Sequence, residues 1–135
     1  MSEGNVELVR RFYEAYDRRD RDAVASCLHP QVEWHTIAGP VFGVDALYGR
    51  ADMLTFLFEQ IPEELPDFCA TLEEVIPVGD EQVLSVAHYV GHGVASGARV
   101  EMQTGALYRF DDGTIAWFRE FATRAEALEA APPPG

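Results

Sequence analysis

The sequence has few basic residues for its number of acidic ones. It contains 10 Lys and Arg against 23 Asp and Glu, which gives a net charge of −13 at pH 7. Such a surface repels nucleic-acid phosphates and anionic membranes, so we expect no nucleic-acid partner. No apolar stretch approaches the roughly 18 residues that a membrane-spanning helix requires, and we therefore expect no membrane partner either.

Cysteine is also scarce, with only Cys27 and Cys69 present. Two cysteines match no metal-binding or disulfide framework, so we interpret both as buried thiols in a reducing compartment. Residues 1–12 contain no apolar run that would indicate a signal peptide, and we expect a soluble, cytoplasmic protein. No phosphate-binding loop, nucleophile elbow or dinucleotide fingerprint is present, and we expect no cofactor.

The N-terminal half has the pattern of helices. Apolar side chains at helical spacing predict a helix over residues 3–18 and a second, short helix capped by Asp20. Alternation predicts a strand over 31–37, and the Gly-rich segment 38–49 is expected to form a loop. A third apolar stripe predicts a helix around 53–61.

The C-terminal half has the pattern of a β-meander. The predicted strands cover residues 68–78, 82–93, 98–110 and 115–122, and a last short helix covers 124–131. Helices followed by long antiparallel strands predict an α+β fold.

Glycines inside the predicted strands, Gly91, Gly93 and Gly105, suit a strong bend of the sheet. A strongly bent sheet wrapped around a helix would leave a cone-shaped cavity. The length of 135 residues suits one domain, which we expect over 1–131, followed by a disordered Pro-rich tail at 132–135.

Three segments, residues 6–36, 48–57 and 109–130, resemble in order and spacing the SnoaL-like branch of the nuclear-transport-factor-two-like superfamily. Its members include ketosteroid isomerases, limonene-epoxide hydrolases and polyketide cyclases. The resemblance implies a cone-shaped α+β barrel, in which a strongly curved mixed or antiparallel sheet wraps around three N-terminal helices. It also implies a deep pocket between sheet and helices, and a homodimer formed through the sheet.

The resemblance can be followed to single residues. Glu120, in the segment FREFA, matches the general base of the epoxide hydrolase. The Arg and Asp that assist this base correspond to Ala87 and Tyr89, so these proton-relay partners are missing. Phe12 and Ala106 stand where ketosteroid isomerase has hydrogen-bond donors, and neither can stabilise an oxyanion. We therefore expect no ketosteroid isomerase activity.

Glu120 is the candidate catalytic residue. Strand alternation places Phe118 and Glu120 on one face and Arg119 on the other, and the resemblance directs the first face toward the pocket. A carboxylate between apolar neighbours is desolvated, which favours its neutral form and suits acid–base chemistry. Two alternatives stay open: Glu120 is a buried acid bonded to a neighbouring strand, or the faces are reversed and Arg119 lies inside.

Further side chains are candidates for contact with a ligand. Trp34 and Thr36 share one face of a strand and would offer a ring for stacking and a hydroxyl for orientation. Tyr89 lies among small residues, so its hydroxyl has room to reach a ligand. The candidates are Trp34, Thr36, Tyr89, Phe118, Tyr108, Phe12 and Tyr16. For the aromatic residues, packing in the core is the alternative.

His88 and His92 have the spacing of a zinc-binding helix, but they lie in a predicted strand. Four residues of a strand span about 13 Å, which a single ion with bonds of about 2 Å does not bridge. We therefore expect no metal site.

Two functions are compatible with these residues. The first is a pocket protein for a small apolar or polyketide- or steroid-like molecule, acting as a cofactor-independent isomerase, cyclase or hydrolase through Glu120. The second is a non-catalytic ligand-binding or scaffold homodimer of the same fold. Retention of Glu120 favours the enzyme, and the missing relay at Ala87 and Tyr89 favours the binding protein.

Overall fold

The computed structural model describes residues 2–37 and 42–132. Its helices are α1 (Ser2–Asp17), α2 (Arg21–Cys27), α4 (Arg50–Thr55), the π-helical turn η1 (Phe56–Gln60), α5 (Ile61–Glu64) and α6 (Arg124–Ala130). Its strands are β1 (Leu28–His35), β2 (Ala46–Tyr48), β3 (Cys69–Val78), β4 (Gln82–His92), β5 (Arg99–Asp111) and β6 (Thr114–Phe121).

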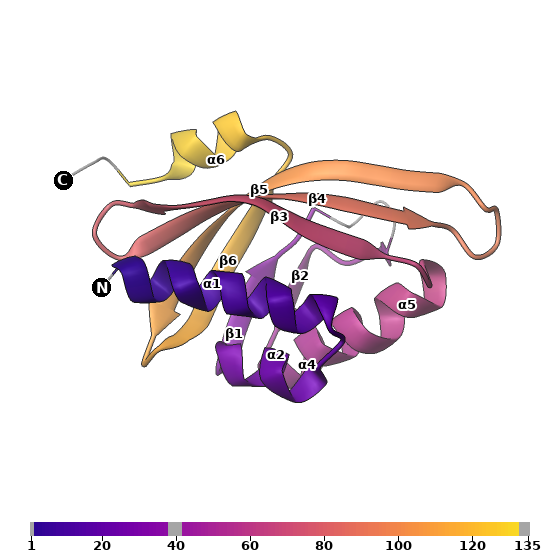
Figure 1. Ribbon diagram of the computed structural model, residues 1–135, viewed down its shortest axis with the longest axis horizontal. Helices are drawn as coiled ribbons and strands as arrows, with labels where there is room; N and C mark the ends of the chain where they lie inside the picture. Colours follow the sequence, from indigo (N-terminus) through magenta and orange to yellow (C-terminus); the bar gives the residue numbers. More distant parts are fainter. Residues whose placement is uncertain (1, 38–41, 133–135) are drawn as a thin grey trace.

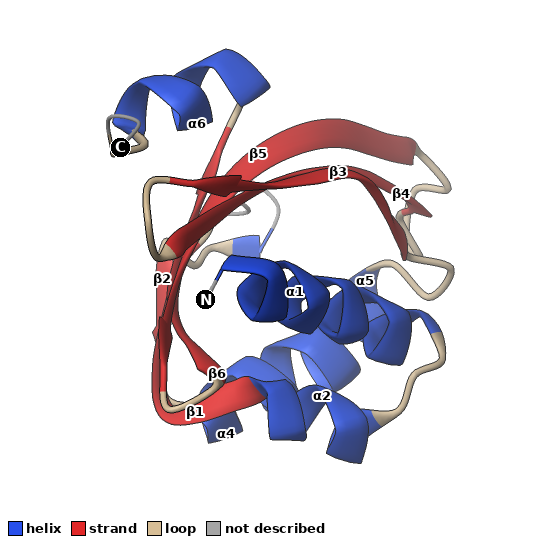
Figure 2. Ribbon diagram, turned by 60° about the vertical axis from the view of Figure 1, so that its left-hand side comes forward, coloured by secondary structure: helices blue, strands red, loops and turns tan. Residues whose placement is uncertain are grey.

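The strands form one mixed sheet in the order β2-β1-β6-β5-β4-β3. Among the strands of the described residues, β1 and β6 pair in parallel and the other neighbours are antiparallel. The sheet curves strongly around α1, with α2 and α4 also on its concave side, whereas α6 lies on the convex side (Figures 1 and 2). The predicted α+β class and the curved sheet around the N-terminal helices are therefore confirmed.

One strand lies where the sequence predicted only a loop. β2 pairs with β1, with Glu33 opposite Tyr48 and His35 opposite Ala46. Three residues are too short for a pattern of alternation, so the strand forms because β1 offers it a pairing edge. β1 itself begins at Leu28, earlier than the predicted start at residue 31.

The cap of α2 forms as predicted. The Asp20 side chain accepts a hydrogen bond of 3.1 Å from the backbone N–H of Ala23, which satisfies one of the free donors at the helix start. Val24 and Cys27 are buried on the inner face of this helix. The other cysteine, Cys69, is exposed at the start of β3, so the expectation that both thiols are buried is wrong for it.

The third predicted helix is interrupted by a π-helical turn. The backbone N–H of Ile61 donates to the carbonyl of Phe56, five residues earlier, and Pro62 has no N–H to donate. The carbonyl of Leu57 therefore lacks its usual helical partner. Tyr16 donates its hydroxyl to this carbonyl at 3.3 Å, which joins α1 to the turn.

Gly105 allows α6 to dock on the convex face. A Cβ atom at this position would lie 2.9 Å from the Cβ of Ala127 and 2.9 Å from the carbonyl oxygen of Thr123. The register of β4 and β5 runs unbroken past Gly91 and Gly105. Gly105 therefore serves close packing and makes no bulge in this pairing.

Among residues 2–37 and 42–132, no helix is long and apolar enough to cross a membrane. Most of the predicted Pro-rich tail, residues 133–135, lies outside the described residues.

Candidate functional site

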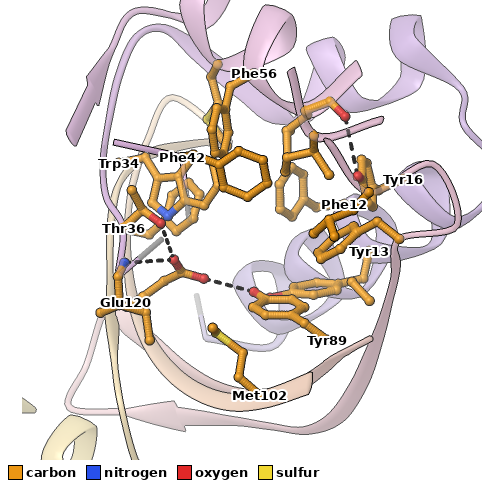
Figure 3. Close-up of a pocket in the computed structure, with 18 of the residues that line it drawn as sticks. Phe12, Tyr13, Tyr16, Trp34, Thr36, Phe42, Phe56, Tyr89, Met102 and Glu120 are labelled. Carbon is orange, nitrogen blue, oxygen red and sulfur yellow. Dashed lines mark hydrogen bonds between the residues drawn. The ribbon is translucent and has the colours of Figure 1, made fainter. Parts of the chain in front are cut away.

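A cavity of about 80 Å³ lies between the concave face of the sheet and the helices. This is room for several water molecules or a small organic molecule. Aromatic rings from α1, β1, β4, β6 and η1 line most of it (Figure 3). The ring-bearing residues that line it are Phe12, Tyr13, Tyr16, Trp34, Phe42, Phe56, Phe68, Tyr89 and Phe118.

Stacked rings form one side of the cavity. Phe118 stacks on Trp34 with ring centroids 5.1 Å apart, and on Tyr108 with centroids 5.2 Å apart. Phe56 meets the Trp34 ring edge-on at 5.4 Å. These offset and edge-on contacts are the arrangements that aromatic pairs prefer, so a ligand would meet a preformed surface.

Glu120 is the charged group of this cavity. It lies on β6 opposite Ala106 of β5, and its side chain is only 6% exposed. Its Oε1 accepts a hydrogen bond of 2.7 Å from the hydroxyl of Thr36 and a longer one of 3.4 Å from the backbone N–H of Ile37. Its Oε2 accepts a hydrogen bond of 2.9 Å from the hydroxyl of Tyr89 (Figure 3).

The surroundings of Glu120 act on its ionisation in two directions. Burial raises the pKa of Glu120, because the charged form loses its hydration. Hydrogen bonds from Thr36, Tyr89 and the Ile37 backbone oppose this effect without cancelling it. No other charged side chain lines the cavity in the described part of the chain. The arrangement suits a carboxyl group that takes up and releases a proton.

Trp34 carries a buried N–H beside this carboxylate. The Nε1 atom has no hydrogen-bond partner among the described residues, although the indole lies near enough to favour the charged form of Glu120. The position of the indole N–H relative to the carboxylate does not meet the geometry of a hydrogen bond.

Most of the predicted ligand-contact residues line the cavity, and one does not. Those that line it, together with Glu120, are Phe12, Tyr16, Trp34, Thr36, Tyr89 and Phe118. Tyr108 is 0% exposed and is not among the lining residues. Its hydroxyl instead lies 3.1 Å from that of Tyr13 and 2.9 Å from Oγ of Ser85.

Several lining residues were not predicted from the sequence. Tyr13 belongs to the apolar stripe of α1, so this stripe could have predicted that Tyr13 lines the cavity. The stripe of the third predicted helix was a signal for Met53, Phe56, Leu57 and Ile61, which also line the cavity. The contribution of Phe68 and Met102 depends on how the sheet curves.

The histidines of β4 have separate acidic partners. His88 Nε2 lies 2.6 Å from a carboxylate oxygen of Glu101, and His92 Nδ1 lies 2.6 Å from one of Asp67. The described residues contain no group of three or more His, Cys, Asp or Glu side chains that could hold a metal ion.

Solved structures share this fold over nearly their whole length. An NTF2-like protein of Burkholderia thailandensis has a TM-score of 0.78 at 24% identity, over 93% of this chain and 95% of that one. TerC, co-crystallised with polyporic acid, has a TM-score of 0.75 at 21% identity, over 93% and 96%. An LEH-like epoxide hydrolase of Mycobacterium tuberculosis has a TM-score of 0.72 at 16% identity, over 95% and 89%. At these identities the likeness concerns the fold alone.

Comparison with curated proteins finds no match. The sequence profile of the SnoaL-like domain matches residues 9–118, which are most of the chain and contain most of the cavity-lining residues. Together with the NTF2-like fold, this match identifies the chain as a member of the SnoaL-like domain family.

Proposed function

We propose that the cavity binds a small, largely apolar molecule and that Glu120 exchanges a proton with it. The observation that carries this proposal is a buried carboxylate, held by two hydroxyl donors, which is the one charged side chain among the described residues that line a largely apolar cavity. The raised pKa of Glu120 brings its ionisation closer to neutrality, where a group serves best as both acid and base.

The proposed chemistry needs only a proton that moves and returns. Glu120 removes a proton from a carbon or from a water molecule that attacks the ligand, and it gives the proton back to the product, so the protein ends unchanged. Thr36 and Tyr89 orient the carboxylate, while the rings of Trp34 and Phe118 hold the ligand. This matches a cofactor-independent isomerase, cyclase or hydrolase.

The comparisons support a ligand of this kind. Proteins of the same fold include TerC, which was crystallised with polyporic acid, and an LEH-like epoxide hydrolase. We therefore propose a polyketide- or steroid-like molecule as the ligand class, which the cavity of about 80 Å³ admits only if its lining side chains move apart. Phe12 and Ala106 supply no donor for an oxyanion, so ketosteroid isomerisation is not part of the proposal.

A non-catalytic binding protein is the second candidate. Both carboxylate oxygens of Glu120 already accept hydrogen bonds, and the described residues supply no second ionisable acid or base to the cavity lining other than tyrosines. A carboxylate held in this way can also serve as a fixed acceptor for a ligand.

The two candidates can be separated with one substitution. The protein is screened against epoxides, ketosteroids and polyketide-like lactones for thermal shifts and for product. For a substrate found in this way, Glu120→Gln should abolish turnover and leave the affinity nearly unchanged. The matched control is Glu7→Gln on the exposed face of α1, which should retain turnover. Binding without product in the wild type would favour the binding protein, and unchanged turnover in Glu120→Gln would exclude Glu120 as the base.

We also propose that the chain forms a homodimer through the convex face of the sheet. On this face the rings of Tyr48 and Trp117 pack near the His35 ring, with centroids 6.3 and 6.0 Å from that of His35. Tyr48 is 62% exposed, so its ring is available for contact with a second chain. Sedimentation equilibrium of the wild type and of Tyr48→Asp tests this. A wild-type mass of one chain would contradict the dimer.

A further inference from the structure

The side chains that line the cavity differ in their contact with solvent. Its floor includes Glu120, Trp34 and Met53, which are at most 6% exposed. A side chain that both lines a cavity and reaches solvent marks an opening. The partly exposed lining residues therefore form the rim of an entrance, and they are Ala70 of β3, Tyr89 of β4, Val100 and Met102 of β5, and Ile37, Phe42 and Phe68.

The cavity has to enlarge before it can hold a ligand with a ring. Its volume is about 80 Å³, whereas an apolar cavity that binds benzene has a volume of about 150 Å³. At least one lining side chain must therefore move when a cyclic ligand enters. A side chain of the rim is the economical choice, because its movement opens the entrance and adds volume at once.

The aromatic residues of the rim are held in place by their contacts. Tyr89 donates its hydroxyl to Glu120 at 2.9 Å. Phe68 packs against the Tyr89 ring with centroids 5.6 Å apart, and Phe42 meets the Phe56 ring edge-on at 5.2 Å. Turning any of these rings away would break a hydrogen bond or a ring contact.

The aliphatic residues of the rim differ in flexibility. Ala70 has only a methyl group, and Val100 and Ile37 are branched at Cβ, which restricts their first side-chain torsion. Met102 is unbranched and has three rotatable bonds, so it changes shape at little cost. Of the rim residues, Met102 is therefore the one best able to move.

Met102 also lies where movement would expose the carboxylate. It pairs with Tyr89 across β4 and β5, so the two residues stand side by side on the concave face. Figure 3 shows the Met102 side chain extending toward the space between Glu120 and Tyr89. If this thioether turned aside, the path from solvent to Glu120 would open.

We propose that Met102 is the gate of the cavity, and that a ligand reaches Glu120 through the rim as the Met102 side chain turns aside. The inference rests on the proposed function, because it concerns the route to the carboxylate that exchanges the proton. Only side-chain torsions change, so the hydrogen bonds from Thr36 and Tyr89 to Glu120 stay in place.

The test measures how easily a small molecule enters the ligand-free protein. The chain has two tryptophans, Trp34 in the floor and Trp117 on the convex face, so Trp117→Phe leaves Trp34 as the only indole. Acrylamide, a small neutral amide, quenches indole fluorescence on contact. The bimolecular quenching constant is the Stern–Volmer slope divided by the fluorescence lifetime. In this background, Met102→Ala should raise the constant several-fold.

Met53→Ala is the matched control. Met53 also lines the cavity, but it lies in the floor and is 1% exposed. The same substitution there enlarges the cavity without opening the rim, so the quenching constant should stay near that of the background. Met102→Phe tests the opposite direction, because a larger side chain with fewer rotatable bonds should lower the constant.

Two results would overturn the gate. One is a quenching constant that Met102→Ala leaves unchanged, and the other is an equal rise in Met53→Ala, which would indicate a general loosening of the packing. Circular dichroism verifies that each variant is folded. If Met53→Ala is not, opposite shifts in Met102→Ala and Met102→Phe support the gate, and shifts of the same sign contradict it. Because acrylamide replaces the ligand, the outcome is independent of the turnover experiment that tests the proposed function.

Discussion

The two faces of the sheet hold their acidic side chains in opposite ways. On the convex face, Glu74 accepts two hydrogen bonds from Arg124, at 2.7 and 3.1 Å, and these lower the pKa of Glu74. Glu101 has Arg99 and His88 as partners, and its pKa is lowered as well. These carboxylates are open to water and bonded to the guanidinium groups of Arg124 and Arg99, which favours their charged form. They hold neighbouring segments together by pairing charges.

On the concave face, the pKa of the acidic side chain is raised instead of lowered. Burial raises the pKa of Glu120, even though Thr36 and Tyr89 donate hydrogen bonds to it. Neutral hydroxyl donors stabilise the charge less than a guanidinium does, and they do not replace the lost hydration. The comparison teaches that the polarity of the surroundings, more than the number of hydrogen bonds, separates a carboxylate suited to proton exchange from one that only pairs charges.

The largest effect is expected from the concave face. Phe118 is 4% exposed and stacks between Trp34 and Tyr108. Phe118→Ala should lower the free energy of unfolding by about 3–5 kcal/mol, because it leaves a cavity in the core. Urea denaturation measures the loss. The control is Phe121→Ala on the convex side of the same strand, which is only half-buried and should lose less. Equal losses would mean that the two faces contribute alike.

A smaller effect is expected where α6 docks on the convex face. Gly105→Ala should lower the free energy of unfolding by about 1–3 kcal/mol, because its new methyl group would overlap Ala127 and the backbone of Thr123. Gly4→Ala is the same substitution in α1 with no atom within 4 Å, and it should raise stability by about 0.5–1 kcal/mol. Thermal unfolding of both variants checks the opposite signs. A neutral Gly105→Ala would contradict the close packing of α6.

The smallest effect is a change in the pH dependence of stability. The folded pKa of Glu120 lies above the ordinary value of 4.5. Its contribution to the free energy of unfolding is therefore fully present below pH 4.5, and it is lost as the pH rises from 4.5 through the folded pKa. Glu120→Gln should remove this decline and gain relative stability as pH rises. Urea denaturation at a series of pH values measures it.

Glu74→Gln provides the mirror image of this experiment. The folded pKa of Glu74 lies below 4.5, so its contribution is present above that value and is lost as pH falls through the folded pKa. Glu74→Gln should therefore be less stable than the wild type above pH 4.5, and this difference should disappear as the pH falls through the folded pKa of Glu74. Parallel pH profiles for the two variants would contradict the contrast between the faces.

The sequence predicted much of the fold because its signals are local. Period-two alternation in residues 115–122 separates Phe118 and Glu120 from Arg119, and the cavity lining contains the first two and not the third. The cap at Asp20 depends on a side chain and a backbone N–H three residues away. Such features need no knowledge of distant segments.

Other features depend on contacts between distant segments. β2 forms because β1 is beside it, and a segment of three residues carries no pattern of its own. Tyr108 shares its strand face with Met102, yet the ring of Phe118 covers it and its hydroxyl turns to Tyr13 of α1. Alternation indicates the face of a side chain and says nothing of its depth.

By itself, the sequence determined most of the helices and strands, the α+β class and the separation of Glu120 from Arg119 on opposite faces of their strand, because each follows from the spacing of neighbouring residues. Only the tertiary structure decided that Thr36 and Tyr89 meet the two carboxylate oxygens of Glu120, and that the Tyr108 hydroxyl meets those of Tyr13 and Ser85. These groups come from segments as far as 95 residues apart, and the curvature of the sheet brings them together.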